Sequence, residues 1–267
     1  MEHETSIQGD GLAIVELSRP QCLNALSLDG FSALADEFEA LGADRAVAAV
    51  LLTGHGRAFC AGADLQSLAA HFSTGAHGGI DPEIMRSHFD SRVNRLLRAM
   101  TALPQPLVCA VNGIASGGGV GLALAGDLVL AARSAAFHLP FGPRLGIIPD
   151  AGASWLVTRA MGPAGALAAM LTAELIPAQR ALDLGLVWRV EDDEALMSVA
   201  ASLARQMAAL PAGMKRRLRE TVERAHVDTF DRHLDHERDV NSELVDHPDF
   251  MEGVAAFREK RAAVFKR

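Results

Sequence analysis

The residues in this sequence best suited to chemistry are a glycine run and one acid downstream of it. Gly117, Gly118 and Gly119 stand together in NGIASGGGVGLALAGD, within 28 consecutive uncharged residues, 99–126. Glycine loses the most backbone freedom on folding, so a run of it indicates a backbone position that a side chain would obstruct. Glycines that open a helix leave N–H groups free, and these could stabilise a developing oxyanion. Tight packing of a helix on a strand is the alternative interpretation of GGG alone.

Better-known glycine and metal motifs do not fit. No Lys-Ser/Thr pair follows the run, as a phosphate-binding loop requires. The dinucleotide pattern G-x-G-x-x-G fails at Leu122, and a nucleophile elbow around Ser116 would need glycine where Ile114 stands. The ten histidines form no H-E-x-x-H or similar cluster, so the sequence predicts no metal site.

Composition narrows the class of protein. The chain has 267 residues, of which 49% are hydrophobic and 22% charged, as in an ordinary soluble globular protein. A net charge of −8 argues against a nucleic-acid-binding face. Cys22, Cys60 and Cys109 are too far apart for a metal site and suit the reducing cytoplasm. The polar start has no signal-peptide pattern, and prolines and glycines break the uncharged run, so we expect no membrane span.

Hydrophobic patterning predicts an α/β core over 1–200 and a helical region over 201–267. A helix is expected from Ser27, which can cap it. Residues 69–88 are the least regular and predict a mobile loop over a site. The other predicted strands are 12–18, 47–54, 107–113, 127–132 and 186–191, and the other predicted helices are 118–126, 152–161, 164–173, 177–185, 193–209, 212–226, 229–245 and 248–265.

Six segments in order resemble the crotonase superfamily, also called the enoyl-CoA hydratase/isomerase family. They are RPQCLNAL (19–26), GRAFCAGADL (56–65), AVNGIASGGGVGLALAGDLVLAA (110–132), GIIPDAGASW (146–155), LGLVWRV (184–190) and EGVAAFREKRAAVF (252–265). The resemblance implies a spiral of ββα units with a C-terminal helical region that builds homotrimers, often paired into hexamers. It also implies an acyl-CoA thioester substrate and no cofactor or metal.

The same resemblance assigns roles to residues by motif position. The N–H groups of Ala63 and Gly118 would hold the thioester oxygen. Ala61, Asp64 and Leu65 of the first loop would contact the substrate or its CoA. Arg57 and Phe59 would flank the adenine and phosphates, and Phe257 and Lys260 would approach the nucleotide, often from a neighbouring subunit.

The acidic residues near the expected thioester site distinguish a hydratase from an isomerase. Hydratases of this family use two glutamates. In this sequence Gly121 stands at the first of these positions, and Gly142 is the nearest counterpart of the second. Asp127 matches a structural position, which leaves Asp150 as the acid near the thioester. From the residues alone, PDAG is a turn in which Asp150 caps a helix. Relatives with isomerase activity carry an aspartate at this point, so we predict a double-bond isomerase in which Asp150 moves the proton.

Three alternatives stay open. A hydratase could draw a glutamate from elsewhere, such as Glu83. A dehalogenase-like aryl-CoA enzyme would use Asp150 as a nucleophile within an aromatic cradle, for which Phe137, Phe141 and Trp155 are candidates. A non-enzymatic acyl-CoA-binding protein is the third. His138 could be an auxiliary acid in any of these or a hydrogen-bonded strand-end histidine.

Overall fold

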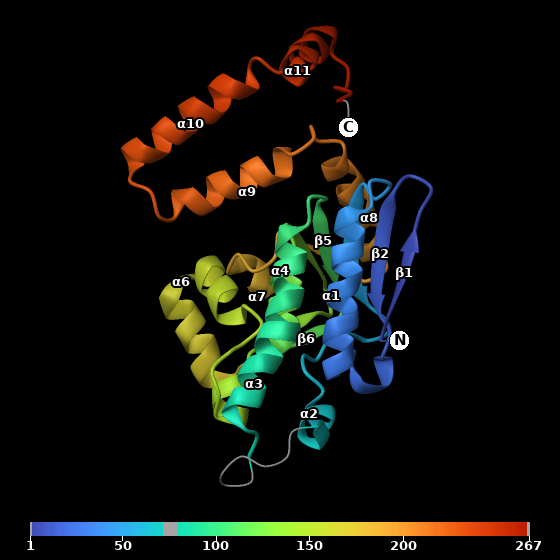
Figure 1. The fold of residues 1–267 in the computed structure, drawn as a ribbon, viewed down its shortest axis with the longest axis vertical. Helices are drawn as coiled ribbons and strands as arrows, with labels where there is room; N and C mark the ends of the chain where they lie inside the picture. Colours follow the sequence, from blue (N-terminus) through green and yellow to red (C-terminus); the bar gives the residue numbers. More distant parts are fainter. Residues whose placement is uncertain (1, 72–78, 266–267) are drawn as a thin grey trace. The chain divides into compact units, whose positions relative to one another are not determined.

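The structure, a computed structural model, describes residues 2–71 and 79–265. The chain forms two compact units, Met1–Arg205 and Gln206–Arg267 (Figure 1). The first unit contains both sheets, and the second is helical. Among the described residues, no helix combines the length and the apolar character needed to span a membrane.

The main sheet has six strands in the order β1-β2-β3-β5-β7-β10. The first pair is antiparallel and every other pair is parallel. All residues of the central strands β3 and β5 are buried, as expected for parallel strands covered on both faces. The strands are β1 (His3–Ile7), β2 (Leu12–Leu17), β3 (Ala49–Gly54), β5 (Leu107–Val111), β7 (Leu128–Ala132) and β10 (Arg189–Glu191).

A second sheet has the order β4-β6-β8-β9 and is made of much shorter strands. They are β4 (Ala58–Cys60), β6 (Ile114–Ser116), β8 (Ala136–His138) and β9 (Ile176–Pro177). Each of β3, β5 and β7 in the main sheet is followed directly by β4, β6 or β8 in the second. This repeated turn confirms the predicted crotonase-like spiral.

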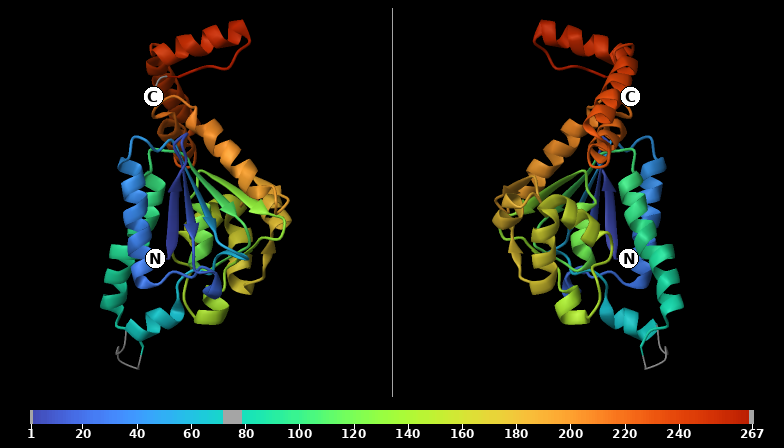
Figure 2. Two further views of the ribbon diagram at one scale, coloured as in Figure 1. Left: turned by 90° about the vertical axis from the view of Figure 1, so that its right-hand side faces the viewer. Right: turned by 90° about the vertical axis from the view of Figure 1, so that its left-hand side faces the viewer.

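Helices cover both faces of the main sheet. α1 (Leu28–Ala43) and α4 (Asn94–Ala102) lie side by side on one face, and α6 (Ala153–Thr172) lies on the other side (Figure 2). The Ser27 side chain accepts the N–H of Gly30 and caps α1 as predicted. Within α6, Gly162 has φ 74 and interrupts the helix between the two shorter helices that the sequence predicts. The remaining short helices here are α5 (Gly118–Leu124) and α7 (Ala178–Asp183).

The segment predicted as an irregular loop is partly helical. α2 (Leu65–His71) extends into its first residues, and α3 (Pro82–His88) is followed by a π-helix, Phe89–Val93, that leads into α4. The loop prediction is therefore wrong for 69–71 and for 82–88. Asp81 accepts the N–H groups of Glu83 and Ile84, and Pro82 fits the first helical position, so this is a capped helix start. Residues 72–78 lie outside the described residues.

The second unit carries α9 (Met214–Ala225), α10 (Phe230–Leu244) and α11 (Pro248–Glu259), and α8 (Leu196–Ala208) precedes them. The last helix ends at Glu259, six residues before the predicted end. Lys260 has φ 55, and the N–H of Arg261 donates to the carbonyl of Ala256, which is a typical helix stop.

Candidate active site

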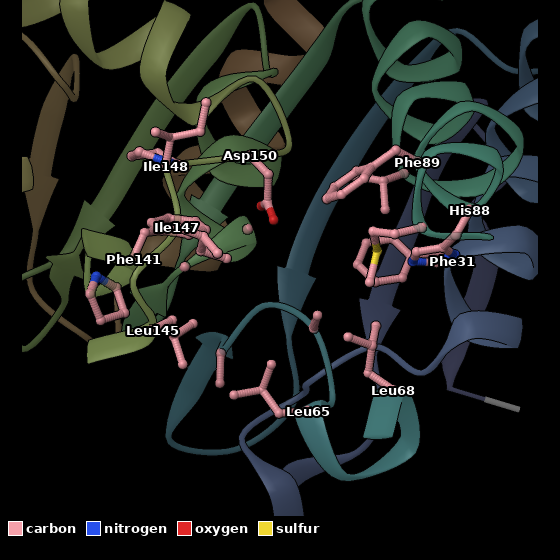
Figure 3. A pocket seen from close by; sticks show the side chains of 18 residues that line it. Phe31, Leu65, Leu68, His88, Phe89, Phe141, Leu145, Ile147, Ile148 and Asp150 are labelled. Carbon is pink, nitrogen blue, oxygen red and sulfur yellow. The ribbon is translucent and has the colours of Figure 1, made fainter. Parts of the chain in front are cut away.

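A cavity of about 520 Å³ opens in the first unit, beside the start of α5. Figure 3 shows Asp150 reaching into it from one wall, with Phe31, His88 and Phe89 on the opposite wall. Its walls are mostly aliphatic and aromatic. The lining residues are Phe31, Ala61, Ala63, Leu65, Leu68, Met85, His88, Phe89, Val93, Gly117, Gly118, Pro140, Phe141, Leu145, Ile147, Ile148, Pro149 and Asp150.

The first predicted donor is the N–H of Ala63. This residue forms an isolated parallel β-bridge with Leu26. In this bridge, Leu26 donates to the carbonyl of Gly62 and accepts the N–H of Asp64, both at 2.8 Å. Because the flanking residues make these bonds, the N–H of Ala63 points away from Leu26. No acceptor among the described residues takes it. Ala63 thus presents an unused donor at the cavity wall.

Ion pairs fix the loop that carries Ala63. The guanidinium of Arg19 lies 3.0 Å from the carboxylate of Asp64 and 3.1 Å from that of Glu2. The N–H of Ser67 and the charge of Arg19 hold the pKa of Asp64 below its ordinary value. The carboxylate of Asp64 is therefore engaged within the protein. These contacts hold the loop in place, and the expected contact of Asp64 with substrate stays a prediction.

Two buried residues, Asn24 and Cys60, hold the loop that carries Ala63 in place. The side-chain amide of Asn24 donates to the carbonyl of Ala58 at 2.8 Å, and the thiol of Cys60 lies 3.3 Å from the N–H of Gly62. Burial raises the pKa of Cys60 to about 12, so this thiol stays protonated. The segment RPQCLNAL thus supplies the framework on which the first donor rests.

The second predicted donor is the N–H of Gly118, the first residue of α5. The first N–H groups of a helix have no partner inside it, and among the described residues no other group accepts this one. The two loops touch at Gly62, where a Cβ would lie 2.8 Å from the nitrogen of Gly118. Gly62 also has φ +87, so only glycine permits this approach. Both donors therefore line one cavity.

Asp150 lies next to the second donor. A Cβ built on Gly118 would be 3.5 Å from Oδ1 of Asp150. Burial raises the pKa of Asp150 to about 6. Such a carboxylate is basic enough to take a proton near neutral pH. Among the described residues that line the cavity, it is the only acid.

The segment that carries Asp150 packs against α5 at Gly121. A Cβ on Gly121 would lie 1.9 Å from the carbonyl oxygen of Ala151. The position that resembles a hydratase glutamate is thus closed by the backbone next to Asp150. Ala151 has φ 49, a left-handed conformation that costs energy in a non-glycine residue and marks a tightly fitted turn.

The structure brings five predicted site residues together around the cavity: Ala61, Ala63, Leu65, Gly118 and Asp150. The assignment of Phe59 as a nucleotide contact is wrong for its side chain, which is fully buried in β4. Arg57 is exposed, outside the cavity lining.

Two further predicted residues belong to the second unit. Phe257 is 86% exposed and lines a separate groove of about 700 Å³ in that unit, and Lys260 ends α11. The expected contacts of Arg57, Phe257 and Lys260 with the nucleotide stay predictions.

The candidates for the alternative reactions lie elsewhere. Glu83 is exposed on α3, where it pairs with Arg86, so it does not supply the cavity with a glutamate. Of the predicted aromatic cradle, Phe141 lines the cavity, whereas Phe137 is buried in β8 and Trp155 stacks on Arg159 on α6.

His138 is placed outside the cavity lining. Its Nδ1 lies 3.2 Å from the hydroxyl of Ser116 on β6, which agrees with the strand-end interpretation.

Sequence reasoning missed the wall opposite Asp150. Phe31 comes from α1, while His88 and Phe89 come from the junction of α3 and the π-helix. The helix-start pair Asp81-Pro82 was the signal that could have revealed this second helical wall. No three metal-ligating side chains gather anywhere in residues 2–71 and 79–265.

The fold agrees with the comparisons with known proteins. The sequence model of the enoyl-CoA hydratase/isomerase family matches residues 8–267. The chain belongs to this family, the crotonase superfamily. Its members process CoA thioesters, so this chain is an enzyme of that class.

Relatives and solved structures from this family carry different reaction names. The 1,2-epoxyphenylacetyl-CoA isomerase of Escherichia coli is 37% identical, across 99% of this chain and 98% of its own length. A 4-chlorobenzoyl coenzyme A dehalogenase from Arthrobacter is 31% identical, across 97% and 92%. An enoyl-CoA hydratase structure from Geobacillus kaustophilus, 34% identical, superposes with a TM-score of 0.86 and covers 100% of this chain and 98% of its own. These names alone do not fix the reaction.

Proposed function

We propose that this family member is an acyl-CoA isomerase that moves a double bond, from 3-enoyl-CoA to 2-enoyl-CoA or in a related isomerisation. Asp150 is the proton shuttle, and the N–H groups of Ala63 and Gly118 form the oxyanion hole. The observation that carries the proposal is the carboxylate of Asp150 beside Gly118, where a Cβ would lie 3.5 Å from it.

The proposed chemistry conserves every atom of the substrate. The carboxylate of Asp150 removes a proton from C2 of the thioester, and the electron pair moves onto the carbonyl oxygen to give a dienolate. The two N–H groups hold that negative oxygen in a site from which apolar walls exclude water. Asp150 then returns the proton at C4 and the double bond moves to C2–C3. No cofactor is needed in this scheme, because nothing is oxidised or reduced.

Hydration is the less favoured alternative. Adding water across a double bond calls for separate groups to place the hydroxide and the proton. The one acid among the described lining residues and the closed space at Gly121 both support isomerisation over hydration.

The proposed acyl group is aromatic or cyclic. Three phenylalanines, Phe31, Phe89 and Phe141, line the cavity and could enclose a ring. The isomerase and dehalogenase relatives are named for 1,2-epoxyphenylacetyl-CoA and 4-chlorobenzoyl-CoA, thioesters whose acyl groups both contain a six-membered ring. The same wall favours a second candidate, a dehalogenase-like reaction in which Asp150 attacks an aryl carbon.

A panel of CoA thioesters tests these proposals. Purified wild type and Asp150→Asn are assayed on 3-enoyl-, 2-enoyl- and haloaryl-CoA substrates. Isomerisation of the 3-enoyl substrate that Asp150→Asn abolishes supports the proposal. Strong hydration of crotonyl-CoA, halide release, or full isomerase turnover in Asp150→Asn would overturn it.

Assembly is part of the proposal as well. We expect homotrimers, alone or paired into hexamers, with Phe257 and Lys260 at the nucleotide. Light scattering coupled to size-exclusion chromatography measures the mass directly.

A further inference from the structure

Two corners of the chain lie side by side where it passes from the main sheet to the second sheet. The first corner is 55–57, between β3 and β4, and the second corner is 112–113, between β5 and β6. They are neighbours because β3 pairs with β5 and β4 pairs with β6. The first corner leads through β4 to Ala63, and the second leads through β6 to Gly118. A side chain that links the two corners can therefore act on both candidate donors.

The side-chain amide of Asn112, in the second corner, makes this link with both of its polar atoms. Its Oδ1 accepts the N–H of Gly54 at 3.1 Å, at the end of β3. Its Nδ2 donates to the carbonyl of Gly56 at 2.8 Å and to that of Ala58 at 3.3 Å. The three hydrogen bonds reach both ends and the middle of the first corner, so one side chain holds the whole turn.

The carbonyl of Ala58 is held by a second asparagine as well. The Nδ2 of Asn24 donates to it at 2.8 Å and to the carbonyl of His55 at 3.0 Å. A carbonyl oxygen has two lone pairs, so the two asparagines together use the full accepting capacity of Ala58. Asn24 belongs to the segment that pairs with Ala63 through Leu26. The carbonyl of Ala58 therefore connects the support of the first donor to the second corner.

Close backbone contacts keep the two loops from moving toward each other. A Cβ on Gly113 would lie 2.2 Å from the carbonyl oxygen of Arg57, and a Cβ on Gly62 would lie 2.8 Å from the nitrogen of Gly118. Such contacts set a smallest separation because atoms cannot overlap, but they do not stop the loops from moving apart. The hydrogen bonds of Asn112 supply this second restraint.

The ladder between β4 and β6 is too short to supply that restraint alone. Each of these strands has three residues, and the register shifts between Ala58 and Cys60. A shift of this kind disrupts the ladder locally. Asn112 bonds to Ala58, where the ladder begins, and so strengthens the link between the two loops at its weakest point.

We infer that Asn112 is a positioning residue that fixes the separation of the N–H groups of Ala63 and Gly118. The inference rests on the proposed function, in which both N–H groups hold the thioester oxygen. Two donors act together on one oxygen only when both lie within hydrogen-bonding distance of it at the same moment. Asn112 does not line the cavity, so it controls the polarisation of the thioester carbonyl without touching the substrate.

The infrared band of a bound thioester carbonyl tests the inference without turnover. Phenylacetyl-CoA with carbon-13 at the thioester carbonyl is bound to the wild type, to Asn112→Ala and to Asn112→Asp. Hydrogen bonds weaken the C=O bond, so the wild type should move the band to lower frequency than in the free ligand. Both variants should return the band toward the position of the free ligand.

Turnover gives an independent measure of the same effect. In both variants, kcat for the preferred thioester should fall about tenfold because the donors are misplaced, and KM should change less. Asn112→Asp keeps an acceptor for Gly54 but turns an oxygen toward the carbonyls of Gly56 and Ala58, so its effect should be at least as large. The bond to Gly56 is exposed, so water can replace it and the variants should fold, which thermal melting checks.

Gln105→Ala is the matched control. Its Nε2 also donates to two backbone carbonyls, those of Leu41 at 3.0 Å and Asp44 at 3.3 Å. This link joins the end of α1 to the segment before β5, at the opposite end of that strand from Asn112. Loss of the link should lower the melting temperature but leave the carbonyl band and kcat unchanged.

The outcomes separate this inference from the proposed reaction. A wild-type band position or a wild-type kcat in both Asn112 variants would contradict the inference, as would an equal effect in Gln105→Ala. A wild type that does not bind the ligand, or binds it without shifting the band, contradicts both the inference and the oxyanion hole. If the band shifts in the wild type and returns in the variants, but Asp150→Asn keeps full turnover, the inference holds and the isomerase proposal fails.

Discussion

The backbones of Gly121 and Ala151 pack so closely that a side chain at position 121 would have no room. A Cβ on Gly121 would lie 1.9 Å from the carbonyl oxygen of Ala151. This contact presses the turn that carries Asp150 onto α5, one helical turn from the donor Gly118. The absence of a glutamate at position 121 is therefore also what allows the aspartate at 150 to reach its place.

Gly121→Glu should not convert the protein into a hydratase. We expect the variant to lose turnover and to melt several degrees lower, because overpacking costs about 1–3 kcal/mol or more. Gly121→Ala should already show part of the loss. Gly253→Ala is the matched control, because this helical glycine has open space around it and the change should be neutral or slightly stabilising. Crotonyl-CoA hydration by a well-folded Gly121→Glu would contradict the interpretation.

Asp150→Asn should lower kcat for the preferred thioester about 10²–10⁴-fold, because the amide cannot accept the proton. The dissociation constant for an unreactive thioester should change little, which separates chemistry from binding. Asp127→Asn is not a suitable control, since Asp127 accepts the N–H of Leu107 in the core. Asp192→Asn, at an exposed ion pair with Arg133, is suitable and should keep wild-type activity.

The pH profile should reflect the pKa of Asp150, about 6. Proton removal needs the ionised carboxylate, so kcat/KM in the free enzyme should rise as pH increases from 5 to 7 and then level off. A profile that is flat across this range, at a rate limited by chemistry, would remove Asp150 from the base role.

Stability should depend on the same group with the opposite sign. The unfolded carboxyl ionises near its ordinary pKa of 3.8, while the folded one holds its proton up to about 6. The folded state therefore loses stability as pH rises between these values, by about 3 kcal/mol at most. Asp150→Asn should melt above the wild type at pH 8, and this gain should shrink at pH 4.

Gly118→Pro tests the second oxyanion donor. Gly118 is the first residue of α5, where proline is sterically acceptable and the N–H makes no helical bond. Removing this donor should lower kcat about 10²–10³-fold. Gly118→Ala keeps the N–H, and its Cβ would meet only ordinary contacts at 3.5 Å, so it should retain much more activity. Equal losses in the two variants would indicate crowding instead of a lost donor.

Arg19→Met tests whether the ion pair with Asp64 positions the first donor. We expect kcat to fall about tenfold, because the loop carrying Ala63 loosens, with KM less affected. Arg133→Met removes an exposed ion pair of similar length with Asp192 and should leave kcat unchanged. A loss confined to KM would point to direct contact of Arg19 with substrate.

The sequence predicted what depends on local backbone chemistry. The glycines at 117–119 indicated free N–H groups at the start of a helix, whereas the resemblance to the crotonase superfamily supplied Ala63, Gly118 and the spiral. Strands of three residues, such as β4 and β6, are too short to show an alternating pattern. The wall of Phe31 and His88 was missed because these residues meet only through the packing of α1 against the π-helix. The pair Asp81-Pro82 marks the start of a helix there, but the local sequence does not show which residues that helix will contact.

The two N–H donors also differ from Asp150 in how sensitive they are to substitution. A peptide N–H survives almost every substitution at its own position, because only proline deletes it, whereas a carboxylate is lost in nearly any exchange. The two N–H groups proposed to bind the thioester oxygen are thus retained through most substitutions. The proposed choice of reaction depends on the side chain of a single residue, Asp150. Proteins descended from one ancestral gene can therefore diverge in the reaction they catalyse while they keep the same hydrogen bonds to the thioester oxygen.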